Sequence, residues 1–296
     1  MLRWTRGCRS VHVVRRVLAY LRSEPFAVAG ATIYALILAV ALLADRLAPY
    51  DPREILRTGR RVARYLPMSA EHWLGTTSSG RDVLSQVIFG TRAALQVGLT
   101  AAVAVVAIGT LLGLLAGYLG GWTDRIVTRL ADVVLGLPFL PFLLVIAALT
   151  KPGTGVIIFS VALLLWPNTA RVIRAQVLSL RERAWVEAAR VTGCSTPRIM
   201  FVHVLPQVLP LAALYGSVAI GWAILAEASA SFLGFGDPLA ISWGVMLQEA
   251  YANQALSRGA WNWFTPPGAA IVLMVLAGFM ISRGSEKLLF PKLADQ

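Results

Sequence analysis

The sequence contains few charged residues. Aspartate, glutamate, lysine and arginine together account for 14% of its 296 residues, whereas soluble domains carry about 25%. Hydrophobic residues reach 57%, and the mean hydropathy is +0.68. This composition excludes an ordinary soluble domain and predicts that most of the chain lies in a membrane.

Lysine, cysteine and histidine are also scarce. None of the three lysines (Lys151, Lys287 and Lys292) follows a glycine, so the sequence has no Gly-x4-Gly-Lys-Ser/Thr loop for binding phosphate. The two cysteines, Cys8 and Cys194, are too few for a disulfide framework, and the three histidines are scattered without metal-ligand spacing. We therefore expect no catalytic residue, no metal site and no cofactor bound by this chain.

Six long runs of low charge are candidate membrane spans. Runs of about 18 or more apolar residues are long enough to cross the hydrocarbon core as helices. The first run could be mistaken for a signal peptide, but its length and the long segment before it favour a retained span. We predict an all-α, polytopic membrane protein with an N-terminal segment, 1–25, and a transmembrane domain, 26–290. The spans are expected at about 26–48, 93–119, 131–150, 153–175, 206–228 and 263–284.

Arginine placement predicts the orientation. If the N-terminus lies inside, most of the lysine and arginine residues fall in cytoplasmic segments, as the positive-inside rule expects. The outer loop 49–90 is also rich in arginine, but long loops follow the rule weakly. Both termini and the loop 178–205 are then cytoplasmic, and 229–262 is a second outer loop. The net charge of +12 is explained by this topology and by attraction to anionic membrane lipid, without nucleic acid.

The loop 178–205 carries the signals of two short helices. Ser179 with Glu182 has the spacing of a capping box, which predicts the start of the first helix. Gly193 is placed to end that helix in a left-handed cap. Small residues recur every four positions along it and predict a face that a partner can approach closely: Leu180, Ala184, Ala188 and Thr192.

A second helix is expected directly after this cap. Ser195 or Thr196 followed by Pro197 predicts an N-cap with proline in the first turn, where its missing N–H costs nothing. The helix should then run on toward Pro206. The loop therefore has the form of two helices joined at Gly193.

One pattern in this loop resembles a known family. Glu187-Ala188-Ala189, three residues, Gly193 and then Leu205-Pro206 is similar to the cytoplasmic loop of ATP-binding-cassette importer permeases. His203 departs from the isoleucine frequent at its position, in a way that resembles the peptide and nickel branch. Three further stretches are similar to that branch: Trp73-Leu74-Gly75-Thr76 with Gly80-Arg81-Asp82, then 115–122, and then 226–234 with Ser242-Trp243-Gly244.

The resemblance implies a function and an assembly. It implies the fold of a type I importer permease and one half of a pathway for di- or oligopeptides or a similar small solute. The implied partners are a second, related permease, two subunits that bind ATP and magnesium, and an extracytoplasmic solute-binding protein. The implied location of the chain is the cytoplasmic (inner) membrane of a prokaryote. The ATPase-coupling residues would be Glu187, Ala188, Ala189, Gly193, Leu205 and Pro206. The alternative, an ion-coupled secondary transporter or channel, predicts paired charges and broken helices at the bilayer midplane.

Glu227 is the sharpest candidate within the spans. An ionisable group beside a span is a functional candidate, here for the translocation path or its gate. It lies 21 residues after Pro206, or about 31 Å along a helix, and so near the outer mouth. The competing interpretation is a carboxylate that satisfies backbone donors of the serine-rich turn that follows.

Three other features favour structural roles. Gly109, Gly113 and Gly117 share one face of the second predicted span and favour close helix packing over a moving gate. Asp132 is expected to be an interfacial charge near Arg129. The aromatic cluster 261–264, containing Trp261, Trp263 and Phe264, is expected to form an interfacial belt at the outer end of the last span.

Overall fold

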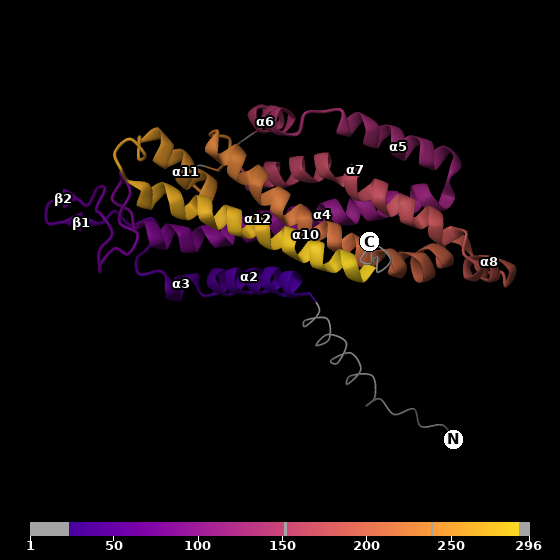
Figure 1. Ribbon diagram of the computed structural model, residues 1–296. Helices are drawn as coiled ribbons and strands as arrows, with labels where there is room; N and C mark the ends of the chain where they lie inside the picture. Colours follow the sequence, from indigo (N-terminus) through magenta and orange to yellow (C-terminus); the bar gives the residue numbers. More distant parts are fainter. Residues whose placement is uncertain (1–23, 151–152, 238, 290–296) are drawn as a thin grey trace, which may run out of the picture.

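The computed structural model describes residues 24–150, 153–237 and 239–289. They form an elongated bundle of long helices, with a small hairpin at one end and a short helix at the other (Figure 1). The predicted N-terminal segment, apart from its last two residues, and Lys151-Pro152 in the predicted turn lie outside the described residues.

The helical prediction is confirmed, apart from strands β1 and β2, which pair antiparallel with Arg57 opposite Val62. The elements are α2 Pro25–Leu42, α3 Ala44–Leu47, β1 Arg57–Thr58, β2 Arg61–Val62, α4 Val83–Leu119, α5 Gly121–Leu135, α6 Phe139–Leu149, α7 Thr154–Arg181, α8 Ala184–Val191, α9 Thr196–Arg198, a π-helical segment Ile199–Val204, α10 Leu205–Phe232, α11 Trp243–Ala252 and α12 Trp261–Leu289.

Five single helices are long and apolar enough to cross a membrane, and the predicted third span is not one of them. Residues 131–150 are divided between α5 and α6, which meet at a bend of 88°. Pro138 stands between the two helices, and proline disfavours helical backbone in the residue before it. The arginine-bearing α5 is held along α7 by ion pairs from Asp124 to Arg174 (2.6 Å, Oδ2 to Nη2) and from Asp132 to Arg171 (2.6 Å). Asp132 therefore pairs across helices, not with Arg129.

Helices α4 and α10 extend beyond the spans that the sequence predicts for them. Helix α4 begins ten residues early because Asp82 caps it, accepting a hydrogen bond from the Ser85 backbone N–H at 2.8 Å. Helix α10 is continuous with α9, so that Thr196–Phe232 forms one apolar helix. At the junction the Leu205 N–H bonds to Met200 O, five residues back. Pro206 follows within the first turn of α10, and its backbone has no N–H to leave unpaired.

The α4 and α7 helices pack closely through the glycine face. A Cβ added to Gly113 would lie 2.6 Å from Ala170 O, and one added to Gly117 would lie 2.8 Å from Arg174 O. A Cβ at Gly109 would lie 2.6 Å from the Thr169 Cβ. The prediction of close helix packing is confirmed, because nothing larger than hydrogen fits at these positions.

The predicted aromatic belt is wrong for Trp263. Trp263 is 0% exposed and belongs to the core that α2, α4, α10, α11 and α12 share, whereas Trp261 is 60% exposed. Helix α12 begins at Trp261, and Pro266 and Pro267 lie inside it, beyond its first turn. The first turn thus points one tryptophan outward and the other into the bundle.

Candidate functional site

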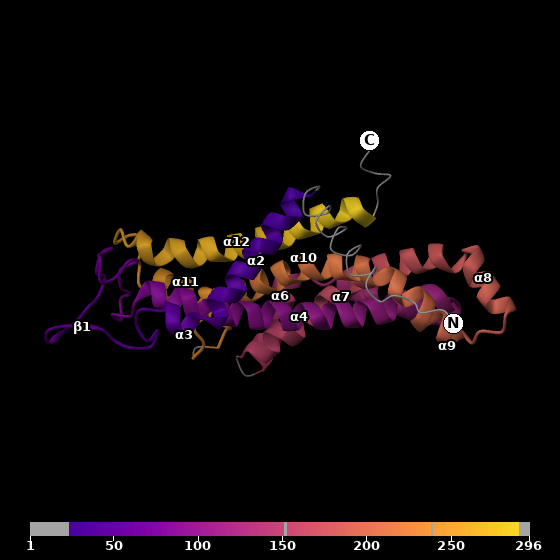
Figure 2. The ribbon, with the colours of Figure 1, turned by 90° about the horizontal axis from the view of Figure 1, so that it is seen from below.

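The candidate site is the turn of the chain around α8. This helix and α9 follow α7 at the end of the bundle opposite the β-hairpin (Figures 1 and 2). Val186 anchors α8 through a fully buried side chain in a core cluster with Val177 of α7 and Ile199. The core therefore fixes α8 rigidly to the ends of two long helices.

The predicted capping box is wrong. Helix α7 continues through Ser179 to Arg181, and Glu182 is its C-terminal cap. The Arg181 guanidinium donates to Gly117 O at 3.2 Å, which ties this last turn to α4. Helix α8 starts after Arg183, whose side chain makes no capping hydrogen bond. Packing against α4 thus extends α7 past the local start signal.

This later start divides the predicted small-residue stripe. Leu180 belongs to α7, and only Ala184 and Ala188 lie within α8. Both alanines are exposed. A narrower small-residue face remains on α8.

The predicted cap at Gly193 is confirmed. Its φ is +80°, in the left-handed region. The Cys194 N–H donates to Ala189 O at 3.0 Å, and the Gly193 N–H donates to Arg190 O at 3.0 Å. This pair of hydrogen bonds is the Schellman motif, which satisfies carbonyls left free by the last helical turn.

The start of the second helix is confirmed, but not its side-chain cap. Ser195 occupies the N-cap position before Thr196–Arg198, and its hydroxyl makes no capping hydrogen bond. Its carbonyl accepts from the Ile199 N–H at 3.1 Å. The backbone alone starts this helix, with proline in its first turn.

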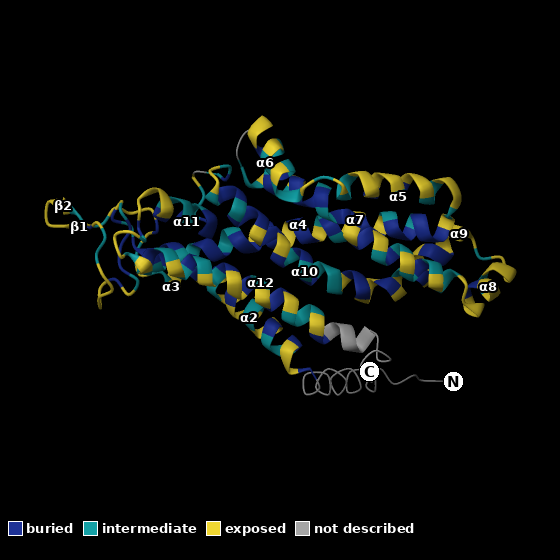
Figure 3. Ribbon diagram, turned by 45° about the horizontal axis from the view of Figure 1, so that its top comes forward, coloured by how far each residue is buried: buried dark blue, intermediate teal, exposed yellow. Residues whose placement is uncertain are grey.

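The predicted coupling residues do not all face outward. Glu187, Ala188, Gly193 and Pro206 are exposed, whereas Ala189 and Leu205 are half-buried against the same core cluster. Figure 3 shows the exposed surface of α8. The exposed, small contact position is therefore Ala188, and Ala189 supports the helix from beneath.

Two exposed apolar side chains enlarge this face and were missed from the sequence. Val191 is 84% exposed, and Trp185 is 40% exposed. They lie three residues to either side of Ala188, a spacing that places them near it on one helical surface. The three-residue spacing of Trp185 and Val191 from Ala188 is the sequence signal that could have identified both side chains.

Charge borders the apolar face. Arg181, Glu182, Glu187 and Arg190 line a hollow of about 480 Å³. The Arg190 guanidinium lies 5.5 Å from the ring centroid of Tyr118 on α4, within cation–π range. The site thus presents an apolar patch beside a mixed-charge hollow, a geometry suited to docking a partner.

Glu227 lies apart from this loop. It is buried on α10, close to the C-terminal end of that helix, where Ser231 Oγ donates to its Oε1 at 2.7 Å. Ser242, the N-cap of α11, is a second hydroxyl partner. The carboxylate is thus satisfied by serine side chains and not by backbone donors, and its role in a path or gate stays a prediction.

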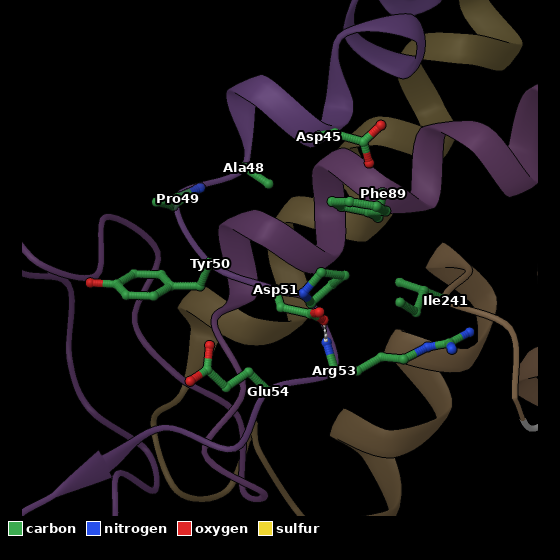
Figure 4. Close-up of a pocket in the computed structure, with 10 residues that line it drawn as sticks. Asp45, Ala48, Pro49, Tyr50, Asp51, Arg53, Glu54, Phe89 and Ile241 are labelled. Atoms are coloured by element: carbon green, nitrogen blue, oxygen red, sulfur yellow. Dashed lines mark hydrogen bonds between the residues drawn. The ribbon is translucent and has the colours of Figure 1, made fainter.

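Two further hollows lie away from this loop. One of about 420 Å³ lies among α4, α6, α7 and α10 and is mainly apolar, with Asn168 and Tyr215 among its polar lining residues. The other, of about 610 Å³, lies between the segment 45–54, Phe89 and Ile241 (Figure 4). Within the described ranges, no group of three or more His, Cys, Asp or Glu residues is placed to hold a metal ion.

Comparison with known proteins gives consistent similarities. Residues 109–295 match the family described as binding-protein-dependent transport system inner membrane component, and residues 13–67 match the N-terminal transmembrane domain of oligopeptide transport permease C. The chain is 36% identical over 268 residues to the glutathione transport system permease protein GsiD of Pectobacterium atrosepticum, covering 90% of this chain and 87% of that protein. It is 32% identical over 280 residues to the dipeptide transport system permease protein DppC of Alkalihalophilus pseudofirmus, covering 94% and 90%. It is 31% identical over 287 residues to the oligopeptide transport system permease protein OppC of Bacillus subtilis, covering 96% and 92%.

Proposed function

The chain belongs to the family of binding-protein-dependent transport system inner membrane components, and from this premise we propose that it forms one half of an ATP-driven pathway for importing small peptides. The names of its relatives specify glutathione, dipeptides and oligopeptides. These solutes share peptide bonds and free termini. A second, related permease would supply the other half of the pathway.

The observation that carries this proposal is the exposed face of α8. Apolar side chains left open at the tip of a rigid element mark a protein contact, and Ala188 leaves room for a partner's backbone. Two separate ATPase subunits, one docked on each permease, would move α8 when they close on ATP and magnesium. The buried Val186 and the continuous helix Thr196–Phe232 would pass that movement into the membrane.

The proposal includes an orientation. It places α8 and both chain termini in the cytoplasm and the β-hairpin end outside, where a solute-binding protein would dock. The arginines around α8 support this placement through the positive-inside rule. The bilayer would be the cytoplasmic membrane of a prokaryote.

Cysteine labelling tests the orientation. In a background without Cys8 and Cys194, single cysteines at Ser69 and Ser195, both exposed, are treated with a membrane-impermeant maleimide in cells stripped of any outer membrane. We expect Ser69→Cys to react and Ser195→Cys to react only after permeabilisation. Labelling of Ser195→Cys alone in intact cells would invert the topology and remove the docking argument.

Reconstitution tests the division of labour. Because the sequence has no phosphate-binding loop, we expect the purified chain to hydrolyse no ATP by itself. ATP-dependent uptake of dialanine into liposomes should require the sister permease, the ATPase subunits and the binding protein together. Hydrolysis by the isolated chain, free of contaminating ATPase, would contradict the proposed roles.

A further inference from the structure

A second polar hollow lies beside the one in Figure 4 and shares Arg53 and Ile241 with it. It has a volume of about 290 Å³, which is close to the lower limit for ligand pockets. Its walls come from the segment 49–82 that precedes α4 (the outer segment), the start of α4, the 239–242 loop and α11. Four sequence-distant elements therefore converge on it.

The hollow carries opposite charges at short range. Arg81 Nη1 lies 3.8 Å from Glu249 Oε1, and both side chains are about one-third exposed. This separation is too long for a hydrogen bond. Burial raises the pKa of the Glu249 carboxyl, and the charge of Arg81 offsets only part of this rise. Both charged groups are thus accessible to solvent, and neither forms a hydrogen bond with the other.

Two polar atoms at this hollow have no partner. In the part of the chain that the structure describes, Arg81 Nε and Gln86 Oε1 are buried without a hydrogen bond. Gln86 is 3% exposed, and its Nε2 donates to Pro52 O at 3.3 Å. Buried polar groups without partners are costly and uncommon in native structures. A polar ligand or an ordered water in the hollow would relieve this cost.

Arg53 adds a second cation on the other wall. Its Nη2 donates to Leu239 O at 3.3 Å, and Figure 4 shows the guanidinium extended toward the Ile241 segment and away from Glu54. Arginine pairs well with planar carboxylates because its donors form a fixed fork. The hollow thus offers cations for a carboxylate and one anion for an ammonium group.

We propose that this hollow between the outer segment and α11 is a binding site for a small zwitterion, taking its carboxylate on Arg53 and Arg81 and its ammonium on Glu249. The occupant is the free-terminal end of a peptide, held on the outer side after release from the binding protein. This assignment rests on the proposed peptide import function. A zwitterionic lipid headgroup has the same pair of charges, so the experiment separates the two sources.

The test measures equilibrium binding of radiolabelled dialanine to the assembled importer in phosphatidylglycerol nanodiscs, whose headgroup has no ammonium, without binding protein. We expect Arg81→Met and Glu249→Gln each to weaken binding at least tenfold, because each removes one charge contact. Arg81→Lys should retain part of the affinity. Arg57→Met and Glu71→Gln are matched controls at exposed positions outside the hollow and should bind as the unaltered protein does.

Blocked probes make the test independent of folding. N-acetyl-dialanine lacks the ammonium, so it should bind the unaltered importer at least tenfold more weakly than dialanine and should be insensitive to Glu249→Gln. Dialanine amide lacks the carboxylate and should be correspondingly insensitive to Arg81→Met. Equal binding of all three probes to the unaltered importer, or dialanine binding by both variants equal to that of the unaltered importer, would overturn the site.

Two arms identify what a failure means. Competition by phosphatidylethanolamine added to the nanodiscs would assign the hollow to lipid and overturn the peptide assignment. Dialanine binding that is unchanged by this lipid supports the peptide. If the unaltered importer shows no ATP-driven dialanine uptake, the proposed function fails. If ATP-driven uptake is intact but neither Arg81→Met nor Glu249→Gln changes dialanine binding, only the proposed binding site is contradicted.

Discussion

Gly193→Val is expected to reduce uptake by at least tenfold while leaving the amount of protein in the membrane nearly unchanged. A non-glycine residue in the left-handed region costs about 1–2 kcal/mol, and a β-branched side chain is stiffer still. Nothing lies within 4 Å of a Cβ placed at Gly193. The substitution therefore strains the Schellman cap without a steric clash, and the strain should displace α8 from the ATPase contact.

A graded series separates this effect from general damage. Gly193→Asn should retain most uptake, because asparagine tolerates the left-handed conformation. Gly155→Val is the matched control, since a Cβ at Gly155 also has nothing within 4 Å and its φ is not positive. Uptake and ATPase co-purification are each normalised to permease abundance. Normal values for Gly193→Val would remove the coupling role from this cap.

The exposed face of α8 gives an independent check on the same contact. Ala188→Trp places a bulky side chain on the docking face and should also abolish ATPase retention with normal abundance. Ala189→Trp is expected to differ, because Ala189 packs against the core and a large side chain there should lower abundance. Equal behaviour of the two variants would contradict the assignment of the outward face.

Gly113→Val is expected to lower the stability of the protein and its abundance in the membrane. Its Cβ would lie 2.6 Å from Ala170 O, 2.9 Å from Ile173 Cβ and 3.1 Å from Arg174 N. Backbone atoms cannot rotate away, so α4 and α7 must separate. Overpacking of this kind costs about 1–3 kcal/mol or more, which lowers the ratio of folded to unfolded protein by up to about a hundredfold.

Membrane abundance and thermal aggregation in detergent measure this effect. Gly113→Ala should already lower the aggregation temperature, because the clash comes from the Cβ itself. Gly268→Val in α12 is the control, since nothing lies within 4 Å of a Cβ placed there. A Gly113→Val protein with normal abundance and thermal stability would show that the α4–α7 contact is less close than described.

The sequence by itself determined the features that depend on composition and local backbone chemistry. Scarce charge and long apolar runs predicted a polytopic helical membrane protein, because unpaired backbone groups are too costly in lipid for other open structures. The left-handed cap at Gly193 followed from the freedom of glycine. The glycine spacing in α4 predicted close packing, although not its partner helix.

Only the tertiary structure decided where helices stop and which faces remain open. Ser179 and Glu182 are an adequate local start signal, yet packing of α7 on α4 and the Arg181 contact with Gly117 carry the helix past them. The third predicted span bends by 88° at Pro138 while α5 stays beside α7 through two ion pairs. Positions 188 and 189 are both alanine, and the sequence does not distinguish them. Only the core beneath α8 leaves Ala188 exposed for a partner and packs Ala189 against the bundle. The hollow at Arg81 and Glu249 likewise joins residues 168 positions apart, because only the folded chain brings α11 against the outer segment.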